Sequence, residues 1–394
     1  MAEPNDFLPE DQLSRARSLF PHTAQGKVYL NHAATSPLST RVVEAMSRYL
    51  RNRSEGKLET YQDDLPMVDE CKGFIREMIQ AESVDRIALT ANTSDAINII
   101  ATGIPWKTGD RILLNTAEFP ANVWPWVNLK RHGIRLDFIP GADGRITIDR
   151  ILDGLTPRTR IVALSAVQFL SGFRADLATI GDVCRSRGII FAVDGIQAVG
   201  AVKINVQKMK IDALAAGGQK WQMSPHGTGF LYVSEELQSI MQQVNLGWLG
   251  VADPWDFHNY AQPLAPGAGR YEGGSKVMPS LWGMHAALKT LLEFGRAPIE
   301  KHILGLTGKL IEDLKAISGV EVVTPTDPDE RAGIISIRLP HGSDEQAVFK
   351  GLLQENITVA LREGLLRYSP HFYCSPDDIR TAVEVTAQLV SRVR

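Results

Sequence analysis

Short apolar runs in the middle of the chain predict buried strands. Strands that are covered on both faces show such runs, because none of their side chains faces water. Six runs of this kind lie between residues 86 and 233, at 86–90, 111–115, 160–166, 189–193, 212–216 and 227–233. Segments with helical periodicity separate several of them, including residues 177–187. The alternation predicts an α/β fold with a mostly parallel sheet.

Helical periodicity prevails outside this region. Residues 39–50 and 65–79 form predicted helices before the first strand, and residues 279–294 form a long predicted helix after the last one. The pattern beyond it is mixed, with helices at 299–317, 343–354 and 376–393 and strands at 320–323, 333–338 and 357–361. We therefore predict an N-terminal arm (residues 1–26), a large domain (27–278) and a small C-terminal α+β domain (279–394).

Candidate functional side chains follow the ends of five predicted strands. They are Thr93, Phe119, Gln168, Asp194 and Lys220. In open parallel sheets, ligands bind in the crevice outside the carboxyl ends of the strands. The five residues are therefore expected to surround one ligand site.

Composition excludes several functional classes. The 394-residue chain has a net charge of −3, so it lacks the basic surface expected for binding nucleic acid or an anionic membrane. No apolar run approaches the ~18 residues of a membrane helix, and the N-terminal residues do not resemble a signal peptide. The three cysteines, Cys71, Cys184 and Cys374, form neither a metal-binding spacing nor a disulfide framework. These features predict a cytoplasmic protein without a metal.

Asp194 and Lys220 suit one cofactor when they are considered together. Alone, the aspartate would be a turn or helix cap and the lysine a solvated loop charge. Pyridoxal 5'-phosphate (PLP) needs a carboxylate that keeps its ring nitrogen protonated and a lysine that holds its aldehyde as a Schiff base. Lys220 lies among Ala, Gly and Trp221. Partial burial there should lower its pKa and favour the nucleophilic neutral amine.

Residues 194–220 resemble the active-site segment of the class V aminotransferase family, which includes the cysteine desulfurases. The shared pattern is Asp194-x-x-Gln197, a long gap, Gly217-Gly218-Gln219-Lys220 and a Gly-x-Gly strand. Gln219 replaces the family's usual His, but its amide can still donate to a phosphate oxygen. The resemblance implies a PLP-dependent transferase fold of type I, whose large domain holds a mostly parallel seven-stranded sheet. It also implies action on an amino-acid amine through a Lys220 aldimine.

Further cofactor contacts follow from the same resemblance. Thr93 and Ser94 match the family's phosphate-binding residues, although plain helix capping is the alternative. Phe119 replaces a His that stacks on the cofactor ring; an aromatic face still stacks, but it cannot transfer a proton. Gln168 takes the place of an Asn close to the ring oxygen or the substrate. Gln197 would bond the ring oxygen.

Three more residues are assigned by family motifs. His32 would face the substrate, with turn capping as the alternative. Ser275 would reach the phosphate site of a neighbouring subunit, which implies a homodimer with composite active sites. Arg367 would bind the substrate carboxylate with two parallel hydrogen bonds, unless it is a surface arginine.

The reaction type stays open at this point. An aminotransferase, a C–S or β-elimination lyase and an epimerase share the same core chemistry. A cysteine desulfurase is disfavoured, because the loop that carries its reactive cysteine is missing between Arg362 and Arg367 and Cys374 comes too late. A nucleotide-binding oxidoreductase is a remote alternative, since no G-x-G-x-x-G follows an early strand. A non-catalytic scaffold would be expected to have lost Lys220 or Asp194.

Overall fold

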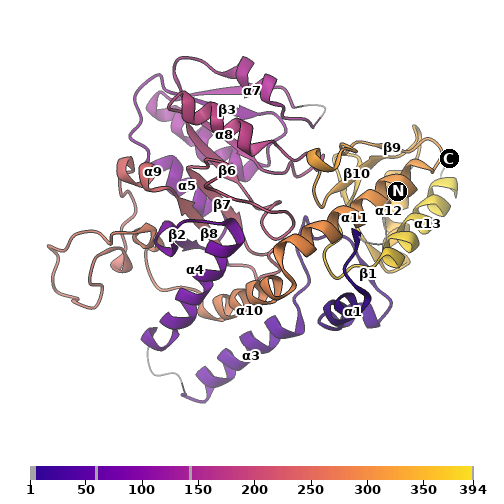
Figure 1. The fold of residues 1–394 in the computed structure, drawn as a ribbon, viewed down its shortest axis with the longest axis horizontal. Helices are drawn as coiled ribbons and strands as arrows, with labels where there is room; N and C mark the ends of the chain where they lie inside the picture. The colour runs from indigo at the N-terminus through magenta and orange to yellow at the C-terminus, as the bar shows by residue number, and fades with distance from the viewer. Residues whose placement is uncertain (1–5, 58–60, 142–143, 393–394) are drawn as a thin grey trace.

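A seven-stranded sheet forms the centre of the larger part of the molecule in the computed structural model, which describes residues 6–57, 61–141 and 144–392 (Figure 1). Its strand order is β2 (Ile87–Thr90), β8 (Gly229–Val233), β7 (Ala213–Gly217), β6 (Ile190–Asp194), β5 (Thr159–Ser165), β3 (Arg111–Asn115) and β4 (Arg135–Ile139). The strands from β7 to β4 pair in parallel, and β8 is antiparallel to both of its neighbours. The predicted mostly parallel α/β sheet is confirmed.

The side chains of the central strands alternate between two apolar layers. Ile190 and Ala192 pack with α5, whereas Phe191 and Val193 belong to the layer that contains residues of α4, α8 and α10. Every residue of β6, β7 and β8 is buried, which explains their continuous apolar sequences. The helices of this part are α3 (Thr40–Ser54), α4 (Leu65–Ile79), α5 (Thr93–Gly103), α6 (Trp124–Val127), α7 (Ile148–Gly154), α8 (Leu177–Ser186) and α9 (Glu235–Ile240).

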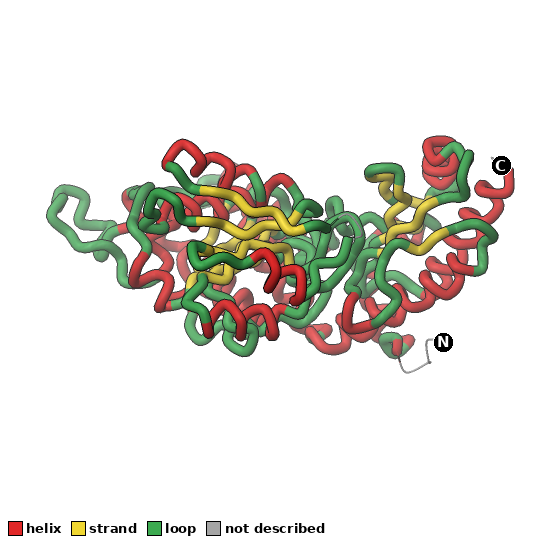
Figure 2. Tube along the Cα trace, turned by 90° about the horizontal axis from the view of Figure 1, so that it is seen from above, coloured by secondary structure: helices red, strands yellow, loops and turns green. Residues whose placement is uncertain are grey.

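A second, smaller sheet lies apart from the first (Figure 2). It is antiparallel, with the order β12 (Ala360–Arg362), β13 (Leu365–Tyr368), β10 (Ile335–Arg338) and β9 (Glu321–Val322). Its helices are α11 (Arg296–Lys315), α12 (Glu345–Gln354) and α13 (Pro376–Arg392), and α10 (Met278–Phe294) leads into α11. The single strand predicted at 357–361 is wrong: β11 (Ile357–Thr358) and β12 join different sheets.

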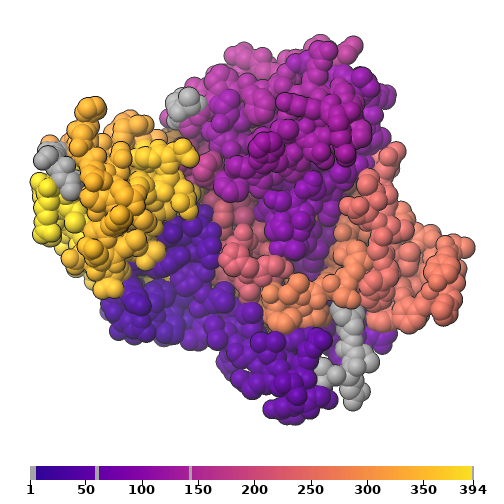
Figure 3. Space-filling view, turned by 180° about the vertical axis from the view of Figure 1, so that it is seen from behind, coloured from indigo at the N-terminus to yellow at the C-terminus, as the bar shows by residue number. Residues whose placement is uncertain are grey.

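The N-terminal segment packs against the C-terminal part of the chain (Figure 3). It contains α1 (Glu10–Ser18), α2 (Pro21–Ala24) and β1 (Val28–Tyr29), and β1 pairs in parallel with β11. Arg17 forms an ion pair of 2.5 Å with Asp378, and the Leu8 amide donates to His302 Nδ1 at 2.9 Å. The smaller part is therefore built from both ends of the chain. The predicted domain boundaries at 26 and 278 stay a prediction.

Candidate active site

Asp194 and Lys220 meet at the carboxyl edge of the large sheet. Asp194 ends β6, and Lys220 follows the end of the neighbouring strand β7 after a short turn. Both residues line one cavity of about 860 Å³, together with Thr93, Ser94, Phe119, Gln197, Gln219 and Arg367. The parallel pairing of the two strands brings these distant residues together, as their positions after strand ends predicted.

One oxygen of Asp194 has no hydrogen-bond partner in the part of the chain that the structure describes. Oδ1 accepts a hydrogen bond from the Ile196 amide at 2.9 Å, whereas the buried Oδ2 has none among the described residues. Burial raises the pKa of this carboxyl group, and the Ile196 amide and the charge of Lys220 oppose that rise. A buried acceptor without a donor is costly. The protonated ring nitrogen of PLP is the kind of donor that would satisfy it, so this residue fits the predicted cofactor.

The Lys220 amine is held in an environment that favours its neutral form. Its side chain is buried, and Nζ lies 5.4 Å from the centre of the Phe119 ring. Burial lowers the pKa of the amine, Arg367 and Arg362 lower it further, and Asp194 raises it. A neutral amine is the form that attacks an aldehyde or accepts a proton. The local electrostatics therefore suit a nucleophile or base.

Gln197 is fixed at both ends of its amide. Its Nε2 donates to the Ala33 carbonyl at 3.0 Å, and its Oε1 accepts from Trp221 Nε1 at 2.8 Å. An amide nitrogen carries two hydrogens, and the residue lines the cavity. The second hydrogen is therefore available to bond a ring oxygen.

The part of the cavity lined by the start of α5 is suited to an anion. Asn92, rather than Thr93 or Ser94, caps α5, because its Oδ1 accepts from the Asp95 amide at 2.9 Å. The capping alternative for the two hydroxyls is therefore wrong. Thr93 Oγ1 accepts from the Gly217 amide at 2.8 Å and keeps its own hydrogen for a ligand. Both residues lie at the positive end of the helix dipole, which favours a phosphate.

Gly217 makes room for this anion-binding end. A Cβ at this position would lie 2.6 Å from Gln219 Oε1 and 3.2 Å from Thr93 Oγ1. Both side chains therefore converge over Gly217, and a side chain at this position would displace the Gln219 amide. This brings the predicted phosphate contacts Thr93 and Gln219 together, although the sequence separates them by more than 120 positions.

Arg367 provides a buried positive charge without a counter-ion. The side chain is 2 % exposed, Nη1 donates to the Phe169 carbonyl at 2.7 Å, and Nε is buried with no partner. It forms no ion pair with any residue that the structure describes, and burial lowers its pKa to about 10. The alternative of a surface arginine is wrong. A substrate carboxylate would supply the missing negative charge.

Sequence reasoning missed the role of Glu118. This buried carboxylate accepts hydrogen bonds from Asn115 Nδ2 (2.5 Å), Asn122 Nδ2 (3.2 Å), the Ser165 amide (2.8 Å), Ser165 Oγ (2.5 Å) and Gln168 Nε2 (3.1 Å). Its oxygens are fully used. Glu118 therefore holds the walls of the cavity rather than a ligand. The sequence offered one indication of this role, since Glu118 directly precedes the predicted cofactor contact Phe119.

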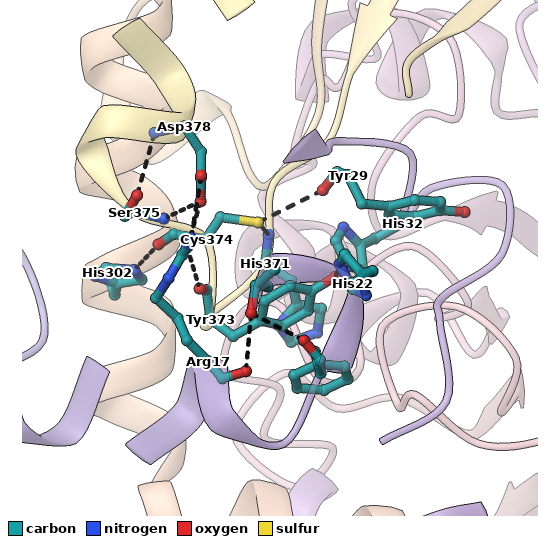
Figure 4. A network of polar contacts seen from close by, with 12 residues as sticks. Arg17, His22, Tyr29, His32, His302, His371, Tyr373, Cys374, Ser375 and Asp378 are labelled. Atoms are coloured by element: carbon teal, nitrogen blue, oxygen red, sulfur yellow. Dashed lines mark hydrogen bonds and ion pairs between the residues drawn. The ribbon is translucent and has the colours of Figure 1, made fainter. Parts of the chain in front are cut away.

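Two predicted contacts do not fit the geometry. Gln168 is 1 % exposed and lies behind Glu118, not on the cavity wall. His32 is fully buried and does not line the cavity. Its Nδ1 donates to the Ser369 carbonyl (2.7 Å), and its Nε2 accepts from the Tyr373 hydroxyl (2.9 Å). Figure 4 shows the residues around it. Its predicted substrate contact is wrong, because both ring nitrogens are occupied by the protein.

Ser275 lies outside this cavity. It lines a separate one of about 270 Å³, together with Thr90 and Asp95. A single chain does not test its predicted contact with a partner's phosphate, which stays a prediction.

None of the three cysteines lines the active-site cavity. Cys374 is 2 % exposed, the His371 amide donates to its Sγ at 3.4 Å, and burial raises the pKa of its thiol (Figure 4). Burial also raises the pKa values of Cys71 and Cys184 to about 12. All three are therefore held as unreactive thiols.

The described residues offer neither a metal site nor a membrane helix. No group of three or more His, Cys, Asp or Glu side chains among them is arranged to hold a metal ion. No helix in the described part is long and apolar enough to cross a membrane.

Comparisons with known proteins identify the family of the chain. The family model for aminotransferase class-V matches residues 28–370. A probable cysteine desulfurase of Pyrococcus abyssi is 29% identical over 98% of this chain and 99% of its own. An uncharacterized aminotransferase of Bacillus subtilis is 24% identical over 98% and 100%. The apo structure of a cysteine desulfurase from Thermococcus onnurineus superposes with a TM-score of 0.87 at 27% identity, covering both chains fully.

The family match covers most of the chain and includes both Asp194 and Lys220. The resemblance and the fold predicted from the sequence are confirmed. The chain belongs to the aminotransferase class-V family, whose enzymes use pyridoxal phosphate as their cofactor.

Proposed function

We propose that this protein acts on the amine of an α-amino acid, with Lys220 and Asp194 holding the cofactor. The observation that carries the proposal is the arrangement of one cavity. It contains a lysine whose pKa is lowered by burial and, counting partners among the described residues only, a buried carboxylate oxygen without a donor and a buried arginine without a counter-ion. The first two match needs of the cofactor, and the third matches the substrate carboxylate.

Each residue has a distinct role in this proposal. When bound, PLP supplies an aldehyde that condenses with amines and a ring that withdraws electrons from the substrate Cα. Thr93, Ser94 and Gln219 would donate to the phosphate. Asp194 Oδ2 would accept from the ring nitrogen, and Phe119 would offer its face to the ring. Lys220 would hold the cofactor and supply the amine that moves the proton at Cα.

The cavity favours one-base chemistry. Phe119 cannot carry a proton, and both oxygens of Glu118 are occupied by hydrogen bonds. We therefore assign Lys220 as the base at Cα. Glu363, in the turn between β12 and β13, also lines the cavity but is exposed to solvent. Transamination and elimination need only one such group, whereas epimerisation uses a proton donor on each face. We therefore propose that the protein is an aminotransferase or a lyase, and we regard an epimerase as the less favoured alternative.

A cysteine desulfurase is the second candidate, and the name of the relative from Pyrococcus abyssi favours it. The cysteines argue against it, because a desulfurase needs a mobile thiol that attacks the substrate sulfur. Free, buried cysteines also fit the reducing cytoplasm proposed from the sequence.

Two substitutions test the proposal: the first probes the substrate carboxylate contact, and the second separates a cysteine desulfurase from the other candidates. Arg367→Lys is expected to raise KM for the amino acid by about tenfold or more, since Lys cannot form two parallel bonds to a carboxylate, while PLP affinity stays unchanged. Cys374→Ala is expected to leave turnover intact. Amino acids are then screened as substrates. The change in the cofactor spectrum and the identity of the released product determine the reaction type. Sulfide release that depends on Cys374, with persulfide on that residue, would restore the desulfurase assignment.

We also propose a homodimer with composite sites. Ser275 lies outside its own active-site cavity, and Val277, two positions further along the chain, is an exposed apolar side chain, as expected for a contact surface. Sedimentation should show a dimer. Ser275→Ala should weaken PLP binding several-fold, since a lost hydrogen bond costs about 1 kcal/mol. A fully active monomer would contradict the proposal.

A further inference from the structure

Arg331 shares an unusual property with the substrate-binding candidate Arg367. In the described part of the chain, these are the two arginines whose Nε is buried without a hydrogen-bond partner. Arg331 is 5 % exposed and, like Arg367, forms no ion pair with any described residue, although the charge of Asp327 acts on it from beyond ion-pair distance. A buried cation without a counter-ion is costly. In the active site, we interpret this property of Arg367 as the mark of a carboxylate-binding site. Arg331 is therefore a candidate to bind a second carboxylate.

The contacts of Arg331 use only part of its guanidinium. Nη1 donates to the Leu304 carbonyl at 3.1 Å and to the Thr307 hydroxyl, both on α11 and both neutral. Nη2 has no hydrogen bond among the described residues and lies 3.2 Å from the point that a Cβ on Gly308 would occupy. Because Gly308 has no side chain, this nitrogen is not covered on that side. At least one donor is therefore left for a ligand.

This side of the arginine borders a cavity of about 610 Å³ that shares no lining residue with the active site. Its apolar wall comes from α11 and the segment after it, with Leu304, Gly305, Gly308, Ile311 and Pro328. Its charged residues are Lys301, Lys315, Arg331, Asp6 and Glu312, so three positive and two negative charges leave a balance of +1. Such a balance suits a monoanion better than a dianion, and the apolar wall suits an organic ligand.

We propose that this cavity binds the carboxylate of a small organic monoanion, with Arg331 as its anchor. A planar guanidinium binds a carboxylate with short, charge-assisted hydrogen bonds. Lys301 and Lys315 add attraction from the rim, and the apolar wall covers the body of the ligand. The site lies on α11, in the smaller part of the molecule, and is independent of the function proposed for the active site (Figure 1).

Calorimetric titration of the PLP-loaded protein with benzoate tests this site. We expect two classes of benzoate sites, one at Arg331 and one at Arg367. Arg331→Gln should weaken one class at least tenfold and leave the other, and Arg367→Gln should do the reverse. Benzamide, the uncharged analogue, should bind neither site. Unchanged benzoate binding in Arg331→Gln would overturn the proposal, and so would equal binding of benzamide. Phosphate that displaces benzoate from the Arg331 site at equal concentration would overturn the choice of a monocarboxylate.

Arg331 also bonds to α11, so its replacement could disturb the fold. The double variant Lys301→Glu, Lys315→Glu avoids this problem, because both lysines are exposed at the rim. It changes the lining charge from +1 to −3, since one positive and four negative charges remain. Benzoate binding at this site should fall several-fold. The matched control Lys289→Glu, Lys350→Glu reverses two exposed lysines away from the cavity and should bind as the wild type does. Equal weakening in both double variants would point to a general charge effect and reject the site.

Discussion

Replacing Lys220 with alanine is expected to abolish covalent attachment of PLP and to lower kcat by at least about 10³-fold. A positioned acid–base group contributes about 10²–10⁴-fold to a rate, and this lysine also carries the cofactor. The wild type should absorb in the near-ultraviolet to violet region, and borohydride should fix the cofactor to a peptide that contains Lys220. The control Lys208→Ala removes an exposed lysine from the segment between β6 and β7 and should leave both properties unchanged. Cofactor fixed to another lysine would contradict the assignment.

The pH dependence of cofactor attachment provides an independent check on the same residue. Only the neutral amine attacks an aldehyde, so the rate at which PLP rejoins the apoprotein should rise with pH through the pKa of Lys220. Burial and the two arginines lower that pKa, so the midpoint should lie below the value of about 10.4 for a free lysine. Arg362→Gln removes one positive charge, which raises the pKa of Lys220 and moves the midpoint to higher pH. A midpoint that stays in place or falls would show that Arg362 does not act on Lys220.

The sequence was sufficient to predict the buried strands of the large sheet and the site residues that directly follow them. Buried parallel strands have continuous apolar sequences, and the residues after them must gather at one edge of the sheet. This is why the order of strands along the chain is enough to place Asp194 and Lys220 together. The resemblance to the family then supplied Arg367, whose strand β13 was not predicted by pattern.

The remaining features depend on how side chains turn once the chain is packed. His32 follows β1 and was expected at the substrate, but its ring turns away because Ser369 and Tyr373 satisfy both of its nitrogens. Gln168 lies three positions after the end of β5, yet its side-chain amide donates to Glu118 and does not line the cavity. No local pattern predicts such contacts, since the partners come from distant parts of the chain. Arg331 was missed for the same reason: its lack of a counter-ion is visible only in three dimensions.

Asp194→Asn is expected to lower kcat by on the order of 100-fold or more while the fold is retained. The amide oxygen of Asn can still accept from the Ile196 amide, so the turn after β6 keeps its hydrogen bond. What is lost is the negative charge at Oδ2, which has no partner among the described residues and is available to keep the cofactor's ring nitrogen protonated. Removing a preorganised electrostatic partner typically costs about 10²–10³-fold in rate. The melting temperature and the steady-state rate of the PLP-loaded variant measure the two properties separately.

Asp212 provides the matched control for this experiment. It directly precedes β7 and also accepts a backbone hydrogen bond, from the Phe191 amide at 2.8 Å, but it does not line the cavity. Asp212→Asn should therefore retain nearly all activity. If Asp194 were only a turn residue, both variants would behave alike, with near-normal turnover. A large loss of turnover in Asp194→Asn alone, at an unchanged melting temperature, would assign the effect to the carboxylate charge, because the hydrogen bond from the Ile196 amide would still be present.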